Sequence, residues 1–123
     1  MTAIQSMLFV PGAKPERFAK ALSSGADCVC IDLEDSVPPA GKDAARAAAL
    51  AALGPPRLAL RINGLTTREG LKDLLALADA GVRPAALFLP KVESPAEIAQ
   101  VRAILGADAP GIVPLIETVK GLE

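Results

Sequence analysis

The segment 27–35 reads Asp-Cys-Val-Cys-Ile-Asp-Leu-Glu-Asp, and it constrains the fold more than any other part of the chain. Successive side chains of a β-strand point to opposite faces. Val29, Ile31 and Leu33 therefore share one face, which is apolar and suited to packing against helices. The other face changes from cysteines to carboxylates toward the carboxyl end of the strand. Parallel α/β folds carry their chemistry at that end of their strands.

The same layout occurs in two later segments. Residues 57–63 alternate apolar side chains with small or charged ones that include Arg61, and residues 111–117 end in the carboxylate of Glu117. Because the carboxyl ends of parallel strands meet at one edge, we expect Glu34, Arg61 and Glu117 to lie at the same rim. Charges that converge from three strands indicate an active site.

Apolar strands alternate with amphipathic helices along the chain. Strands are expected at 6–10, 28–34, 57–62, 86–90 and 112–117, and helices near 15–24, 40–53, 67–80 and 95–105. This alternation predicts a parallel sheet, either a closed (β/α)8 barrel or an open doubly wound sheet. Central strands of an open sheet are apolar on both faces, so the mixed faces favour the barrel. Since such a barrel typically needs about 250 residues, we expect 1–123 to form a partial barrel domain, its N-terminal portion.

Local signals define the helix at 67–80 most sharply. Thr66 and Glu69 have the spacing of a capping box, and Gly81 follows the last helical position. The expected buried stripe has helical spacing and consists of Leu71, Leu74, Leu75 and Ala78.

Composition excludes several classes of protein. The net charge is −1 and there is no histidine, which rules out histidine-based triads and argues against a nucleic-acid surface. No apolar run approaches the roughly 20 residues of a membrane span, and the N-terminus lacks the features of a signal peptide. Cys28 and Cys30 are expected to be small core residues that stay reduced. We therefore expect a cytoplasmic protein with no nucleic-acid or membrane partner.

Six short motifs occur in an order and spacing that resemble the citrate lyase β-subunit family, which includes malyl-CoA lyases. They are Leu8-Phe-Val-Pro-Gly12, Asp32-Leu-Glu-Asp-Ser-Val37, Lys42 with Arg46, Arg61-Ile-Asn-Gly64, Leu89-Pro-Lys-Val-Glu93 and Ile116-Glu-Thr118. The resemblance implies a (β/α)8 barrel that breaks or forms a carbon–carbon bond between a CoA thioester and an α-keto acid, with Mg²⁺ as cofactor. It also implies a homo-oligomer.

The resemblance assigns roles to particular residues. Glu117 matches a metal ligand, and the second protein ligand would lie beyond residue 123. Arg61 matches the arginine that binds the carboxylate of the keto acid, such as oxaloacetate or glyoxylate, while Glu34 and Asp35 match the acidic pair that orients this arginine and the waters of the metal. The positions that match CoA contacts are Phe9, Lys14 and Lys20.

Structural roles compete with these assignments. Arg61 could simply neutralise Glu34 inside the barrel, Asp32 is more often a cap or an arginine partner, and Lys91 could form an ion pair or the Schiff base of an aldolase. Two other functions remain open for the chain as a whole. It could be a non-catalytic fragment that folds only by pairing with another chain, or an open-sheet phosphate-binding protein, although no glycine-rich phosphate loop is present.

Overall fold

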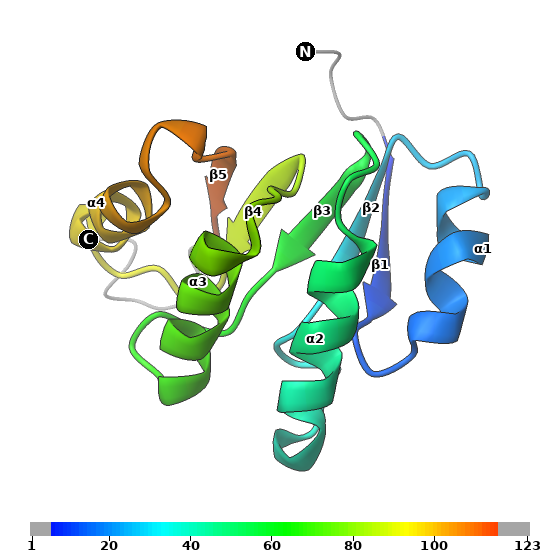
Figure 1. Cartoon of the computed structure of the whole chain (residues 1–123), viewed down its shortest axis with the longest axis horizontal. Coiled ribbons are helices and arrows are strands. Elements are labelled where there is room, and N and C mark those ends of the chain that lie inside the picture. Colours follow the sequence, from blue (N-terminus) through cyan, green and yellow to red (C-terminus); the bar gives the residue numbers. More distant parts are fainter. Residues whose placement is uncertain (1–5, 116–123) are drawn as a thin grey trace.

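The strands form one parallel sheet in the order β1-β2-β3-β4-β5 (Figure 1) in the computed structural model, which describes residues 6–115. The strands are β1 Met7–Pro11, β2 Cys28–Asp32, β3 Leu58–Arg61, β4 Ala86–Leu89 and β5 Gly111–Pro114. This order confirms the barrel prediction, because an open doubly wound sheet would have later strands on both sides of its first strand. The chain forms the N-terminal portion of a (β/α)8 barrel.

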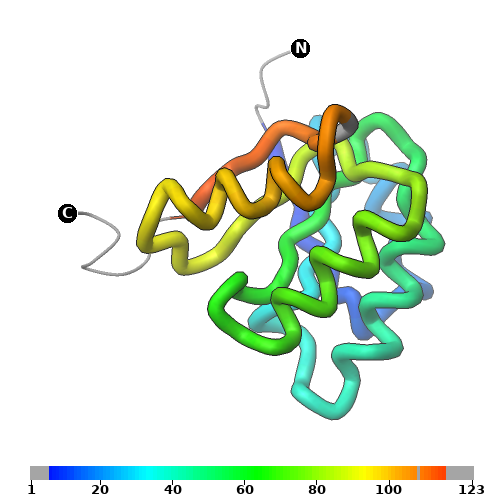
Figure 2. Tube along the Cα trace, turned by 60° about the vertical axis from the view of Figure 1, so that its left-hand side comes forward, coloured from blue at the N-terminus to red at the C-terminus, as the bar shows by residue number. Residues whose placement is uncertain are grey.

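Helices connect the strands. The α-helices are α1 Phe18–Leu22, α2 Lys42–Ala52, α3 Arg68–Ala80 and α4 Pro95–Leu105, and short 3₁₀ segments occupy Pro15–Arg17, Pro39–Gly41 and Gly106–Asp108. Figure 2 shows α3, in green, and α4, in yellow to orange, as neighbouring helices. Within residues 6–115 none of the helices has the length and hydropathy that a membrane span requires.

The two faces of the sheet bury different side chains, as the alternation predicts. Val29 and Ile31 of β2 belong to the large apolar core on the helix side, whereas Cys28 and Cys30 belong to a smaller cluster on the opposite face. Both cysteines are buried and unpaired with each other. The expectation that they are small core residues is confirmed.

β2 ends at Asp32 rather than at Glu34. The carboxylate of Asp32 accepts hydrogen bonds from the backbone N–H groups of Glu34 and Ser36, at 2.9 and 3.0 Å. An aspartate that binds the backbone two residues later begins a turn. Glu34 therefore lies on a turn at the rim and not in the strand.

The predicted buried stripe of α3 is only partly correct. Leu74 and Leu77 are fully buried, but Leu71 and Leu75 are 42% and 56% exposed. The helix is rotated from its expected orientation because Gly70 packs directly on the preceding turn, where an added Cβ would approach the carbonyl oxygen of Gly64 to 1.9 Å. The N-cap is Thr67, whose hydroxyl accepts a hydrogen bond from the N–H of Gly70, and not Thr66.

Candidate active site

Asp32 and Arg61 form the centre of the rim. They are register partners on the adjacent strands β2 and β3, and the Nε of Arg61 donates a hydrogen bond of 2.8 Å to Oδ1 of Asp32. Asp32 thus binds the arginine and caps the turn of Glu34 and Ser36 with the same carboxylate. Both structural roles considered for Asp32 are present.

Burial raises the pKa of Asp32, but hydrogen bonds from Arg61, Ser36 and Glu34 outweigh burial and lower the pKa to about 2. The side chain is 4% exposed, so solvent screens these bonds little. Charge-assisted hydrogen bonds of this kind are shorter and stronger than neutral ones. Asp32 therefore remains ionised at any pH at which the rim could function.

The stability of the protein should depend on this carboxylate. A group with a lowered folded pKa stabilises the fold above its unfolded pKa, near 3.9, and loses that contribution as pH falls toward about 2. We expect Asp32 to contribute about 2 kcal/mol to the free energy of unfolding at pH 6 and clearly less at pH 3. Urea unfolding of the wild type and of Asp32→Asn at both pH values measures this; an equal stability difference at the two pH values would contradict the assignment.

Glu34 is the second carboxylate of the rim and is 7% exposed. Its Oε2 lies 3.3 Å from Nζ of Lys91, and its Oε1 lies 3.8 Å from Nε of Arg61. Among the described residues Oε1 accepts no hydrogen bond although it is buried. Burial raises the pKa of Glu34, and Lys91 partly offsets this effect. A buried oxygen without a donor is costly, so it is the atom at this rim best suited to receive a donor from a ligand.

Lys91 follows β4 and has a positive φ of 54°. A non-glycine residue in this conformation is uncommon and is held there by its surroundings. Its ammonium pairs with Glu34 from a side chain that is 56% exposed, so the ion pair lies at the rim rather than inside. A charged, ion-paired amine is a poor nucleophile, which disfavours the Schiff-base alternative.

Arg61 also packs on an aromatic ring, which a second ring supports. The guanidinium carbon lies 5.1 Å from the ring centroid of Phe9, within the range of a cation–π interaction. The rings of Phe9 and Phe88 meet edge to face at 6.3 Å. The hydrogen bond to Asp32, partly offset by burial, raises the pKa of Arg61. Within residues 6–115 neither Nη1 nor Nη2 of Arg61 donates a hydrogen bond to another side chain, so these two nitrogens can donate to an anion.

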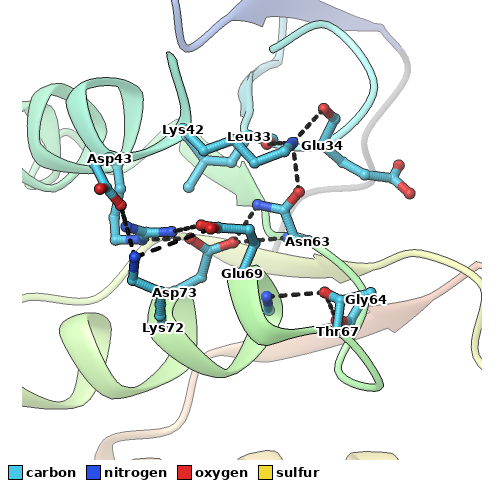
Figure 3. Close-up of polar contacts among 12 residues, drawn as sticks. Leu33, Glu34, Lys42, Asp43, Asn63, Gly64, Thr67, Glu69, Lys72 and Asp73 are labelled. Atoms are coloured by element: carbon cyan, nitrogen blue, oxygen red, sulfur yellow. Dashed lines mark hydrogen bonds and ion pairs between the residues drawn. The ribbon is translucent and has the colours of Figure 1, made fainter. Parts of the chain in front are cut away.

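A pocket of about 250 Å³ opens beside this rim. Its lining residues come from the turns after β2, β3 and β4 and from the start of α2, and they are Glu34, Asp35, Lys42, Asn63, Gly64, Leu65, Thr66, Thr67 and Lys91. Figure 3 shows Lys42 directed toward Glu34 and Asn63. The sequence does not single out Lys42 and Asn63 as site residues. Their only signal is that each belongs to one of the six short motifs of the family.

The other predicted site residues are dispersed. Asp35 is exposed next to Glu34 and lines the pocket, while Lys14 and Lys20 are exposed before and within the short helix α1. Glu117, the predicted metal ligand, lies outside the described residues. In the part of the chain that the structure describes, no group of three or more Cys, Asp or Glu side chains could hold a metal ion by itself.

Comparison with known proteins agrees with this architecture. The family model described as HpcH/HpaI aldolase/citrate lyase matches residues 5–118. The chain belongs to this family. A citrate lyase subunit beta-like protein of Mycobacterium tuberculosis is 42% identical over 116 residues, which cover 93% of this chain and 39% of that protein. An L-malyl-CoA/beta-methylmalyl-CoA lyase of Cereibacter sphaeroides is 40% identical over 106 residues, with 81% of this chain and 33% of that protein covered.

Solved structures show the same relationship. The citrate lyase beta subunit of M. tuberculosis complexed with oxaloacetate and magnesium matches with a TM-score of 0.79 and 40% identity, over 94% of this chain and 48% of that one. CitE of the same organism in complex with magnesium, acetoacetate and coenzyme A gives a TM-score of 0.80 and 38% identity, over 97% of this chain and 43% of that one. The chain thus spans less than half the length of these relatives.

Proposed function

We propose that this chain carries the N-terminal part of the active site of a Mg²⁺-dependent lyase for 3-hydroxyacyl-CoA esters of the citryl-CoA or malyl-CoA type. In this reaction the 3-hydroxyl group loses its proton and the adjacent carbon–carbon bond breaks. The products are an α-keto acid and the enolate of a CoA thioester, which then takes up a proton on carbon. The observation that carries the proposal is the Asp32–Arg61–Glu34 cluster at the carboxyl ends of β2 and β3.

Arg61 is the proposed binding residue for the carboxylate of the keto acid. Its Nε is bound by Asp32 and its position is further fixed by the ring of Phe9. A guanidinium held in this way presents a preorganised pair of donors to a planar carboxylate. Glu34 and Asp35 are the proposed acidic pair, with Glu34 oriented by Arg61 and Lys91.

The donor atoms of the rim fit a hard divalent cation. Mg²⁺ prefers oxygen ligands and keeps several waters, and the unsatisfied Oε1 of Glu34 and the exposed carboxylate of Asp35 are suitable acceptors for such waters. Glu117 is the proposed direct ligand. When bound, Mg²⁺ would act as a Lewis acid that polarises the keto oxygen.

The thioester is proposed to lie on the side of β1. Phe9 is 46% exposed, and Lys14 and Lys20 are exposed beyond it on the following turn and helix. An aromatic ring and two ammonium groups are chemically suited to the adenine and phosphate portions of CoA. The proposal also includes a homo-oligomer, which is supported by the family resemblance.

Replacing Arg61 with lysine should weaken keto-acid binding by about 10- to 100-fold, because a point charge replaces a two-donor fork. Calorimetric titration of the complete protein with oxaloacetate and with glyoxylate, in the presence of Mg²⁺, measures the loss. The matched control is Arg57→Lys, since Arg57 directly precedes β3 and donates to the carbonyl groups of Ala26 and Leu22 at the opposite end of the strand from Arg61. Equal affinities for both variants would refute the role of Arg61.

A further inference from the structure

Lys42, the first residue of α2, makes three hydrogen bonds at the rim. Its Nζ donates to the carbonyl oxygens of Leu33 at 3.0 Å and Glu34 at 2.9 Å, and to Oδ1 of Asn63 at 2.7 Å (Figure 3). An ammonium has three donors and no acceptor, so these bonds use its full capacity. The acceptors lie on the turns that follow β2 and β3, which are the turns after Asp32 and Arg61.

The first turn of a helix is an unfavourable place for a cation, because the helix dipole is positive there. No acidic group that the structure describes forms an ion pair with Lys42, and all its acceptors are neutral. A merely surface-exposed lysine would leave its ammonium in water. The hydrogen bonds to these oxygens therefore explain why a lysine lies here, whereas the dipole of α2 would disfavour it.

Asn63 is fixed independently from the helix layer. Oδ2 of Asp73 accepts hydrogen bonds from the backbone N–H of Asn63 at 2.8 Å and from its Nδ2 at 2.7 Å. Oδ1 of Asp73 in turn accepts from Nε of Arg46 at 2.7 Å. With the amide nitrogen bound to Asp73, the amide oxygen of Asn63 faces Lys42. A rigid buried network thus supports one end of the Lys42 bridge.

We propose that Lys42 is a positioning residue of the active site: it ties the turn after β2 to the turn after β3 and thereby keeps Glu34 beside Arg61. The inference rests on the proposed function for the chemistry of the rim. The bridge fixes the carbonyl groups of Leu33 and Glu34, so the N–H of Glu34 stays on Asp32 and its carboxylate stays within 3.8 Å of Arg61. Without the bridge, the turn after β2 would lose its link through Lys42 to Asn63 on the turn after β3.

Lys42→Met tests the bridge, with Lys72→Met as the matched control. Lys72 lies on α3 and pairs with Asp43 at 3.0 Å and with Glu69 at 3.9 Å, so its loss removes a lysine from the neighbouring network without touching either turn. Carbon-detected NMR titration of the complete protein follows the carboxyl of Asp32, and nitrogen-detected NMR follows hydrogen exchange at Nε of Arg61.

In Lys42→Met the pKa of Asp32 should rise from about 2 toward its usual 3.9, and exchange at Nε of Arg61 should accelerate, whereas Lys72→Met should match the wild type. Lys42→Gln keeps two donors but no charge and should show smaller changes in both signals. If Lys42→Met does not fold, the same comparison is made with Lys42→Gln. A folded variant with unchanged Asp32 and Arg61 signals would overturn the proposal. Oxaloacetate titration of the wild type is a separate arm: failure to bind would remove the proposed function and leave this NMR comparison intact.

Discussion

Asp73→Ala is expected to lower the free energy of unfolding by about 3–5 kcal/mol, the usual effect of removing one partner from a buried ion pair. Asp73 is 2% exposed and accepts three hydrogen bonds through its two oxygens. Its removal leaves Arg46, which is 8% exposed, with only the more exposed carboxylates of Asp43 and Glu69. The two N–H groups donated by Asn63 would also lose their acceptor.

Urea unfolding of Asp73→Ala against Asp79→Ala measures this effect. Asp79 belongs to the same helix and is exposed, so its replacement should change stability by no more than about 0.5 kcal/mol. Similar stabilities of the two variants would show that the contacts between α2 and α3 do not depend on the buried ions.

The second large effect concerns the 123-residue chain expressed by itself. We expect it to associate and to show little or no turnover. β1 and β5 are the outer strands of the sheet, and unpaired strand edges are templates for pairing with other chains. On the face opposite the helices, Phe9 is 46% exposed. In a closed barrel, side chains from the other strands would fill the interior beside it. A site with five of the eight strands would also lack groups that the reaction requires.

Sedimentation velocity and a cleavage assay on this chain test the expectation together. A concentration-dependent increase in mass with negligible turnover is the predicted outcome, and the complete protein serves as the control. A stable monomer with full Mg²⁺-dependent turnover would show that five strands are sufficient and that the proposed dependence on the remaining strands is wrong.

The arrangement of strands could be predicted because the alternation of side chains is a local property. Ile31 and Leu60 lie on the helix side and Cys30 and Ala59 on the other, as their positions in the sequence indicate. Leu87 also lies on the helix side and is fully buried, because its neighbours Ala86 and Phe88 occupy the opposite face of the sheet.

The helix layer was harder to predict because its contacts are not local. Asp73 is a buried carboxylate next to the apolar side chains of α3. Its pairing with Arg46 depends on how α2 and α3 pack against each other, which the sequence does not reveal. The rotation of α3 likewise follows from the contact of Gly70 with Gly64, which no periodicity reveals. The roles of Arg61, Glu34 and Glu117 remain predictions from the family motifs.

Cleavage of citryl-CoA and malyl-CoA by the complete protein tests most directly whether this rim belongs to a metal-dependent CoA-ester lyase. We predict that one of these esters yields a CoA thioester and an α-keto acid in equal amounts. Turnover should stop when Mg²⁺ is chelated and return when it is restored. A folded, complete protein that cleaves neither ester with Mg²⁺ present, or that cleaves equally well without a divalent cation, would contradict the account.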